Sequence, residues 1–151
     1  MTARLVVDSS VLTALVHGKD RHHTKAREWF AGLSGASELL TPSLALCEVA
    51  SALSRNGILP RQVDKAHGML KTWVNVVATS EELIGEATIV ARDQKVRGCD
   101  SIFVALAIKQ QAGLVTFDED QAKKGSSLIT VEFLQSPAAP VAPAAAKGKK
   151  K

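Results

Sequence analysis

Short apolar runs alternate along the chain with longer segments in which apolar and polar positions mix. Short, mainly apolar runs of four or five residues that end at a polar or turn-forming residue are typical of buried strands. Such runs cover residues 3–7, 38–41, 114–117 and 128–131. A further short run at residues 76–78 is either the end of a helix or a third, brief strand.

Between these runs, apolar residues recur at spacings of three and four, which is the period of one helical face. Ala26, Trp29, Phe30 and Leu33 show this spacing. Helices are predicted over residues 9–17, 26–33, 42–56, 60–77, 79–91, 99–111 and 118–124. Strands that alternate with helices stack into a parallel sheet, so the sequence predicts an α/β fold with four or five short parallel strands and helices on both faces.

Two of the helix starts are assigned from capping residues. Thr41 followed by Pro42 places Thr41 at the N-cap and Pro42 at the first helical position. Thr79 with Glu82 three residues later has the spacing of a capping box. Residues 92–98 are polar and are expected to form a loop.

The composition bounds the domain organisation. With 151 residues, of which 46% are hydrophobic, the chain can build one domain with a sizeable core. That domain is expected over residues 1–135. Residues 136–151 are expected to be a disordered Pro/Ala-rich linker and a Lys-rich tail. The last five residues include four lysines, which equal the whole net charge of +4, so the charge of the body does not indicate nucleic-acid binding.

The remaining composition indicates the compartment. No segment is apolar for long enough to span a bilayer, which excludes a membrane protein. Met1 leads almost directly into a strand, so no signal peptide is expected. Cys47 and Cys99 have no metal-ligand spacing and form no disulfide framework. Together these features predict a cytoplasmic protein.

Four acidic residues lie where strands meet helices, or just inside a helix. Asp8 ends the first strand, Asp118 follows a later one, Asp100 opens an apolar helix and Glu48 lies within another helix. The carboxyl ends of parallel strands share one edge of the sheet, so carboxylates from distant parts of the chain would meet in one cavity. Taken singly, each aspartate is better explained as a helix N-cap, and Glu48 as an exposed helical residue.

Taken together, four carboxylates in one cavity need a cation or must take up protons, and a divalent metal is the simpler answer at neutral pH. Two carboxylates about 5 Å apart repel by roughly 3 kcal/mol at an effective dielectric near 20. A helix N-terminus returns only about 0.3–1 kcal/mol. Because oxygen ligands suit Mg²⁺ and Mn²⁺, we expect a Mg²⁺ site here, with Mn²⁺ as the alternative ion.

The segments around these residues resemble PIN-domain nucleases, and in particular the VapC toxins of bacterial and archaeal toxin–antitoxin pairs. The resemblance covers residues 3–135 and rests on LVVDSSV, CEVASAL, DSIFVALA and LVTFD at residues 5–11, 47–53, 100–107 and 114–118. It implies a three-layer fold and a Mg²⁺- or Mn²⁺-dependent endoribonuclease that hydrolyses phosphodiester bonds. It also implies an RNA substrate, a homodimer and a cognate antitoxin.

The same resemblance assigns roles to individual residues. Ser10 matches a serine that supports the first aspartate, and Thr116 matches the threonine beside the last. Asp120 is a nearby carboxylate that could share the role of that last aspartate. The residues that match the family's metal-binding and catalytic acids are Asp8, Glu48, Asp100 and Asp118.

Two groups of basic residues call for an interpretation. Arg92, Lys95 and Arg97 precede the third acidic residue and would suit the rim of an RNA groove, although ordinary solvated charge explains them equally well. His22 and His23 lack ligand spacing and are assigned to a surface turn.

Three other functions are compatible with the sequence. One is a PIN-domain nuclease that processes RNA without an antitoxin. Another is a receiver-like phosphate switch, which would require paired acids after the first strand, where this chain has two serines after Asp8. The third is a catalytically inactive metal- or RNA-binding module, which Mn²⁺ would stabilise without RNA cleavage.

Overall fold

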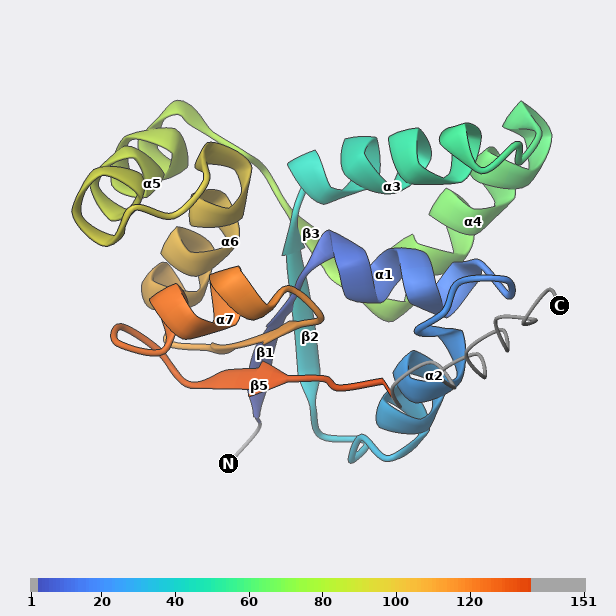
Figure 1. The fold of residues 1–151 in the computed structure, drawn as a ribbon, viewed down its shortest axis with the longest axis horizontal. Helices are drawn as coiled ribbons and strands as arrows, with labels where there is room; N and C mark the ends of the chain where they lie inside the picture. Colours follow the sequence, from blue (N-terminus) through green and yellow to red (C-terminus); the bar gives the residue numbers. More distant parts are fainter. Residues whose placement is uncertain (1–2, 137–151) are drawn as a thin grey trace, which may run out of the picture.

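The computed structural model describes residues 3–136, which form a single five-stranded sheet with helices on both faces (Figure 1). Neighbouring strands all pair in parallel, in the order β3-β2-β1-β4-β5. The strands are β1 (Arg4–Val7), β2 (Glu38–Pro42), β3 (Asn75–Val77), β4 (Gly113–Thr116) and β5 (Val131–Phe133). The predicted α/β fold with a short-stranded parallel sheet is therefore confirmed.

The helices divide into two layers around this sheet. They are α1 (Ser9–Val16), α2 (His23–Ala31), α3 (Leu44–Arg55), α4 (Pro60–Trp73), α5 (Glu81–Gln94), α6 (Gly98–Lys109) and α7 (Glu119–Gly125). Helix α6 packs on β1, β2 and β4, with α5 outside it, while α1 lies on the other side together with α2, α3 and α4 (Figure 1). Helix α7 packs against β4 and β5.

The core is densest where α6 covers the sheet. Every residue from Ser101 to Ala107 is buried, because this helix is enclosed by the strands on one side and α5 on the other. Phe103, Leu106 and Leu114 are fully buried there. A helix that is apolar all round is stable only in such an interior position. Since Asp100 belongs to its first turn, the core fixes where this carboxylate lies.

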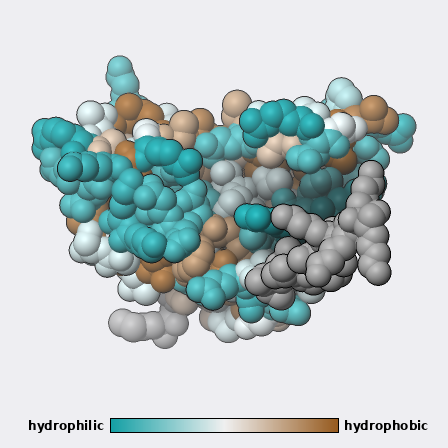
Figure 2. Space-filling view, viewed as in Figure 1, coloured by the Kyte–Doolittle hydropathy of each residue, from teal (hydrophilic) through white to brown (hydrophobic). Residues whose placement is uncertain are grey.

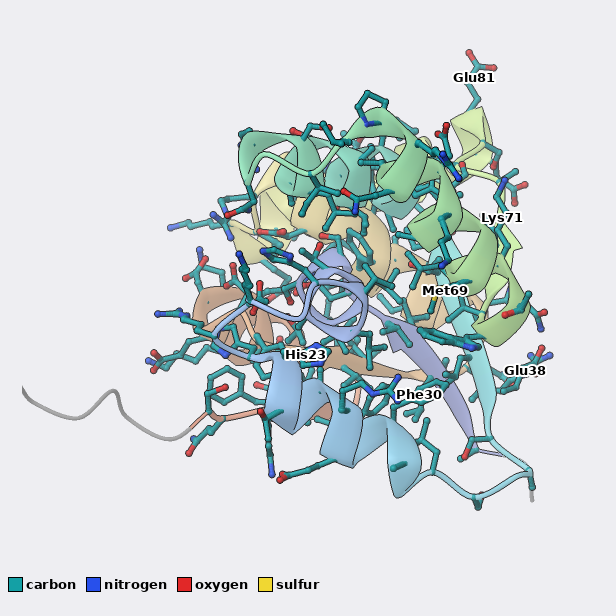
Figure 3. All side chains as sticks on the ribbon, turned by 90° about the vertical axis from the view of Figure 1, so that its right-hand side faces the viewer. His23, Phe30, Glu38, Met69, Lys71 and Glu81 are labelled. Carbon is teal, nitrogen blue, oxygen red and sulfur yellow. The ribbon has the colours of Figure 1, made fainter. Side chains whose placement is uncertain are left out.

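The opposite layer is held by aromatic packing between α2 and α4. The Phe30 ring lies 5.1 Å from the Trp73 ring, centroid to centroid, and 6.5 Å from Trp29. Figure 3 shows this side of the molecule, with the exposed residues Met69 and Lys71 of α4 labelled. On the face shown in Figure 2, hydrophilic residues gather over α5, α6 and α7. Within residues 3–136, no helix is long and apolar enough to cross a membrane.

The two helix caps predicted at Thr41 and Thr79 are wrong. Thr41 is fully buried in β2 and donates its hydroxyl to the Val7 carbonyl at 2.9 Å. Pro42 ends β2 rather than beginning α3, because it pairs with Val77 of the neighbouring strand. The cap of α5 is Ser80, whose hydroxyl accepts from the Leu83 amide at 3.2 Å.

Thr79 instead serves the start of a different helix. Its hydroxyl accepts a hydrogen bond from the amide of Leu44, the first residue of α3, at 3.1 Å. The Ser43 hydroxyl donates to the same Thr79 oxygen, and accepts from the Thr79 amide. Two segments more than thirty residues apart therefore share one cap, which no local pattern could indicate.

Three predicted boundaries also move. Helix α5 continues to Gln94, into the segment expected to be a loop, and α4 ends at Trp73 before the brief strand β3. The last strand is β5 at Val131–Phe133, and it begins three residues later than predicted. The intervening Leu128 is exposed and belongs to the turn after α7, where its amide donates to the Gly125 carbonyl. All of the predicted tail except Ser136 lies outside the described residues.

Candidate active site

The sheet changes winding direction between β1 and β4. From β1 the chain continues to β2 and β3 on one side, and β4 leads to β5 on the other. In open parallel sheets, ligands bind in the crevice at this point, beyond the carboxyl ends of the strands. Asp8 comes directly after β1, and Asp118 comes two residues after the end of β4. Both aspartates therefore lie at this crevice.

Both aspartates also cap helices, as predicted for each alone. The Asp8 carboxylate accepts from the Ser10 amide at 3.3 Å at the start of α1. The Asp118 carboxylate accepts from the Gln121 amide at 2.9 Å at the start of α7. Asp100 does not cap α6: Arg97 occupies the N-cap position, and Asp100 lies within the first turn.

Asp8 is the most enclosed of the four acids, with 3% of its surface exposed. Its Oδ2 atom accepts from the Ser10 hydroxyl at 2.5 Å and from the Thr116 hydroxyl at 3.0 Å. Its other oxygen, Oδ1, is buried and has no hydrogen-bond partner within the described part of the chain. Burial raises the pKa of Asp8, and the hydrogen bonds from Ser10 and Thr116 oppose that rise. An unpartnered buried carboxylate oxygen is costly, so it favours binding of a cation or a proton at this position.

All four predicted acids line the same pocket, which has a volume of about 850 Å³. Glu48 reaches it from α3, and its Oε2 atom is likewise buried without a partner among residues 3–136. Burial is the main cause that raises the pKa of Glu48, and the charges of Asp8 and Asp100 add to it. Burial also raises the pKa of Asp100, with a further contribution from the charge of Asp118. The charges of Asp8 and Asp100 therefore act on Glu48, and the charge of Asp118 acts on Asp100.

Arg97 provides positive charge inside this pocket. Its Nε donates to Asp100 at 2.7 Å, and its Nη2 donates to Asp118. In the region from residue 3 to residue 136, no three acidic, histidine or cysteine side chains are close enough together to share one ion as they stand. The guanidinium thus lies between two of the carboxylates that the sequence predicts as ligands.

The donor set nevertheless fits a hard divalent cation. Mg²⁺ and Mn²⁺ prefer carboxylate oxygens, and two of these in the pocket, on Asp8 and Glu48, are buried and lack partners in the described structure. The Arg97 side chain is 65% exposed, so it can leave Asp100 and Asp118 by rotating toward solvent. Asp8 and Glu48 each keep one buried carboxylate oxygen without a partner in the described structure, whereas Asp100 and Asp118 are both engaged by the Arg97 guanidinium.

The predicted supporting residues form one hydrogen-bonded unit. Besides donating to Asp8, Thr116 accepts from the Asp118 amide at 2.9 Å, and Ser10 accepts from the Phe117 amide at 3.2 Å. The two hydroxyls therefore tie the start of α1 to the end of β4. Asp120 lies outside this unit: it pairs with Lys124 at 2.7 Å and lines a neighbouring pocket.

Gln121 is a site residue that the sequence analysis did not identify. It is fully buried, and its Nε2 donates to the Asp100 carbonyl at 3.3 Å. The backbone amide of Gln121 also donates to the Asp118 carboxylate. Gln121 therefore joins the first turns of α6 and α7. The signal was present as the Asp-x-x-Gln spacing of an N-cap and the third helical position.

The three basic residues that were predicted to bind RNA do not lie together at one site. Arg92 is exposed on α5 and pairs with Asp93 at 2.6 Å. Lys95 is exposed in a left-handed conformation after that helix, at φ 54°. Of these three, only Arg97 is among the residues that line the acidic pocket. Their binding to RNA remains a prediction.

Comparisons with known proteins find similar sequences. The sequence model of the family described as "PIN domain" matches residues 5–126. The chain is 34% identical over 135 residues to the protein named Ribonuclease VapC3 of Pyrobaculum aerophilum, covering 84% of this chain and 98% of that relative.

Solved structures share the fold. The crystal structure of VapC20 from Mycobacterium tuberculosis, described as a Sarcin-Ricin loop cleaving toxin, aligns with a TM-score of 0.70 at 24% identity, covering 80% of this chain and 95% of that one. A toxin–antitoxin complex from Klebsiella pneumoniae aligns with a TM-score of 0.67 at 16% identity, covering 85% and 95%. At these identities the likeness concerns the arrangement of helices and strands.

Proposed function

The chain belongs to the PIN-domain family, and from this premise we propose that it is a divalent-metal-dependent endoribonuclease and the toxin of a VapBC-like toxin–antitoxin pair. One observation carries the catalytic part of the proposal. Asp8 is buried with an unpartnered oxygen, within the described residues, in a pocket that also holds Glu48, Asp100 and Asp118. The name of the 34% identical relative supports RNA as the substrate.

The proposed reaction is the hydrolysis of an RNA phosphodiester bond. Asp8 and Asp100 would hold the principal ion, with Mg²⁺ as the first candidate and Mn²⁺ as the second. When bound, such an ion activates water and neutralises the negative charge that develops on the phosphate. Ser10 and Thr116 hold the Asp8 carboxylate in one orientation through its Oδ2, which would leave Oδ1 available to hold the ion.

The other two acids have complementary tasks in this proposal. Burial raises the pKa of Glu48, which makes its Oε2 a stronger acceptor for a proton from the attacking water. Asp118, which Arg97 now engages, would also hold the ion once the guanidinium is displaced. The released guanidinium remains beside the pocket, where it can bind a phosphate oxygen of the RNA.

The family membership also supports an antitoxin partner. One of the solved structures with this fold is a toxin–antitoxin complex. An antitoxin that covered the acidic pocket would prevent both metal and RNA from entering. We include a homodimer in the proposal as the expected assembly of the toxin.

The test is to incubate the purified chain with a mixed RNA pool in Mg²⁺, in Mn²⁺ or in chelator, beside the Asp8→Asn variant. Cleavage is expected only when Mg²⁺ or Mn²⁺ is present. The Asp8→Asn variant should cleave RNA at least a hundredfold more slowly while its circular dichroism spectrum stays unchanged. Asp93→Asn is the matched control, since Asp93 is an exposed carboxylate that pairs with Arg92 away from the pocket. Equal cleavage by Asp8→Asn and the unmodified chain would refute the assignment.

A further inference from the structure

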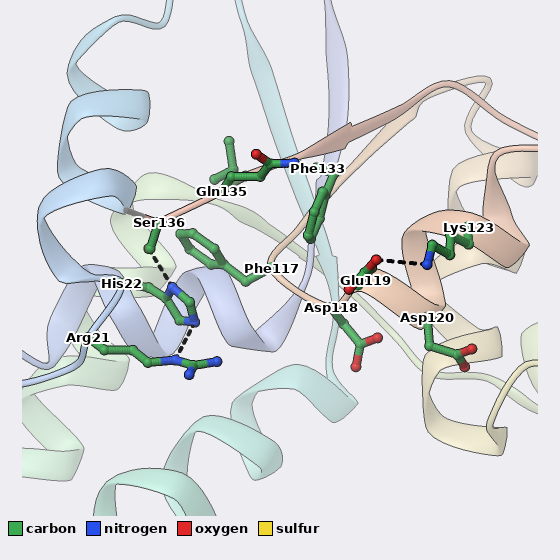
Figure 4. A pocket seen from close by; sticks show the side chains of 11 residues that line it. Arg21, His22, Phe117, Asp118, Glu119, Asp120, Lys123, Phe133, Gln135 and Ser136 are labelled. Atoms are coloured by element: carbon green, nitrogen blue, oxygen red, sulfur yellow. Dashed lines mark hydrogen bonds and ion pairs between the residues drawn. The ribbon is translucent and has the colours of Figure 1, made fainter. Parts of the chain in front are cut away.

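A second pocket, of about 950 Å³, opens beside the acidic one (Figure 4). The two pockets share His22 and Asp118 among their lining residues. We propose that this second pocket, here called the ring pocket, binds a nucleobase of the RNA strand next to the cleaved phosphate. The inference rests on the proposed ribonuclease function, and it adds a substrate-binding site with its own residues.

The walls of the ring pocket include three rings from separate parts of the chain. His22 precedes α2, Phe117 follows β4 and Phe133 ends β5. The His22 and Phe117 rings are stacked, with centroids 4.2 Å apart and an interplanar angle of 18°. Figure 4 shows these side chains around the same space, with Asp118 below them in the view. Flat aromatic groups are the platforms on which proteins stack unpaired bases.

The His22 ring is fixed in one orientation and one tautomer. The Arg21 Nε donates to His22 Nε2 at 2.9 Å, so Nε2 is the acceptor and the proton lies on Nδ1. That Nδ1 then donates to the Ser136 hydroxyl at 2.5 Å. Burial and the Arg21 charge lower the pKa of His22, which keeps the ring neutral. A neutral ring held at both nitrogens is a preformed stacking surface.

The charges around the pocket favour a base over a phosphate. Three of its lining residues are acids, Asp118, Glu119 and Asp120, which would repel a phosphate. Lys123 is already paired with Glu119 at 2.7 Å, and Arg21 is engaged with His22. A nucleobase is uncharged and carries N–H donors and ring acceptors at its edge. Carboxylates, together with the side-chain amide of Gln135, can read such an edge.

The connection to the acidic pocket gives the strand a path. Phe117 and Asp118 are consecutive, so the stacking surface and one proposed metal ligand are fixed to the same stretch of backbone. That stretch is anchored to Ser10 through the Phe117 amide and to Thr116 through the Asp118 amide. A nucleotide with its phosphate at the acids therefore has a ring-lined pocket beside it for its own base or the next one.

The test measures binding by the Asp8→Asn chain, which does not cleave, to two fluorescein-labelled single-stranded RNAs of equal length. One has all its bases, and the other lacks the bases at its central positions, so the phosphate charge is the same. The complete strand is expected to bind about tenfold more tightly, as one stacked base typically provides. Adding Phe117→Leu or Phe133→Leu should reduce this ratio to about twofold or less, with little change for the base-free strand.

Phe30→Leu is the matched control, because the Phe30 ring packs on Trp73 between α2 and α4 instead of lining the ring pocket. It should keep the tenfold ratio. Thermal melts identify any variant that does not fold, and Phe133, at the end of the edge strand β5, is the site that least disturbs the core.

The outcomes separate the two proposals. Cleavage of RNA by the unmodified chain, combined with equal binding of both strands or with an unchanged ratio in the leucine variants, overturns the ring pocket alone. A pocket that serves only a protein partner would give this equal binding. If the unmodified chain neither cleaves RNA nor binds either strand, the ribonuclease function itself is overturned, and the ring pocket with it.

Discussion

Arg97 donates a hydrogen bond to Asp118, from a residue 21 positions earlier in the chain. Because Arg97 also donates to Asp100, one guanidinium neutralises part of the charge on two neighbouring helix starts. A divalent ion bound by these acids must compete with that guanidinium. The protein thus supplies its own counter-charge to a group of acids that would otherwise repel one another.

Arg97→Gln should therefore bind Mn²⁺ more tightly in the absence of RNA. The Arg97 side chain is 65% exposed, so each of its ion pairs is worth only about 0.2–1 kcal/mol. Removing both should lower the dissociation constant by roughly threefold to tenfold, measured by titration calorimetry or Mn²⁺ electron paramagnetic resonance.

Arg92→Gln is the matched control, because it removes the same charge from an arginine that pairs only with Asp93 among the residues described. It should leave the metal affinity unchanged. If both variants tighten binding equally, the effect is one of net charge rather than of the Arg97 bridge. If neither does, the bridge does not compete with the ion.

Asp8→Asn should stabilise the metal-free protein while it removes metal binding. The asparagine carbonyl can accept the hydrogen bonds that Ser10 and Thr116 now give to Oδ2. Its neutral amide then replaces the buried oxygen that lacks a partner in the described structure. The free energy of unfolding in chelator should rise by roughly 1–3 kcal/mol, because a neutral amide costs less to desolvate than the buried carboxylate whose pKa burial raises. Urea unfolding with and without Mn²⁺ measures both effects, and a less stable variant would contradict the expectation.

The sequence was sufficient to predict Asp8 and Asp118 as neighbours. Each follows an apolar run, and a parallel sheet brings the carboxyl ends of its strands to one edge. The local pattern and the global topology agree at these positions. Glu48 depended on the family resemblance, since its helical position alone indicated an exposed residue, whereas the structure places it half-buried in the pocket.

Arg97 and the ring pocket could not be predicted in the same way. The position of Arg97 depends on how α6 and α7 lie relative to each other, and that is set by the burial of α6 on the sheet. The ring pocket depends on β5, whose start was predicted three residues too early. As an edge strand of three residues, it has too short an alternating pattern for its register to be read from sequence. Phe133 was therefore not expected to lie near Phe117.

His22 should make stability depend on pH. Its folded-state pKa is lowered from the usual 6.5 by burial and by Arg21, so at acidic pH the unfolded chain binds more protons than the folded one. This contribution to stability is complete above about pH 6.5 and is lost as the pH falls through the lower folded value. Urea unfolding from pH 8 to pH 5 should show a larger loss for the unmodified chain than for His22→Gln. Parallel curves for the two proteins would contradict it.

Thr116→Val should weaken the site and the fold together, because one hydroxyl serves both aspartates. Thr116 is fully buried, donates to Asp8 and accepts from the Asp118 amide. Valine has nearly the same shape but leaves that amide and the Asp8 carboxylate without this partner. The free energy of unfolding should fall by roughly 1–3 kcal/mol. The Mn²⁺ affinity should also fall, because only the Ser10 hydroxyl then orients the Asp8 carboxylate.

Thr41→Val separates these two effects. Thr41 is equally buried, but its hydroxyl donates to the Val7 carbonyl rather than to a carboxylate. It should lose a similar amount of stability in urea while binding Mn²⁺ as the unmodified chain does. Thr116→Ser, which keeps the hydroxyl, should retain most of the metal affinity. If Thr116→Val and Thr41→Val lose metal affinity equally, the Thr116 hydroxyl has only a structural role, and the orientation of Asp8 is set elsewhere.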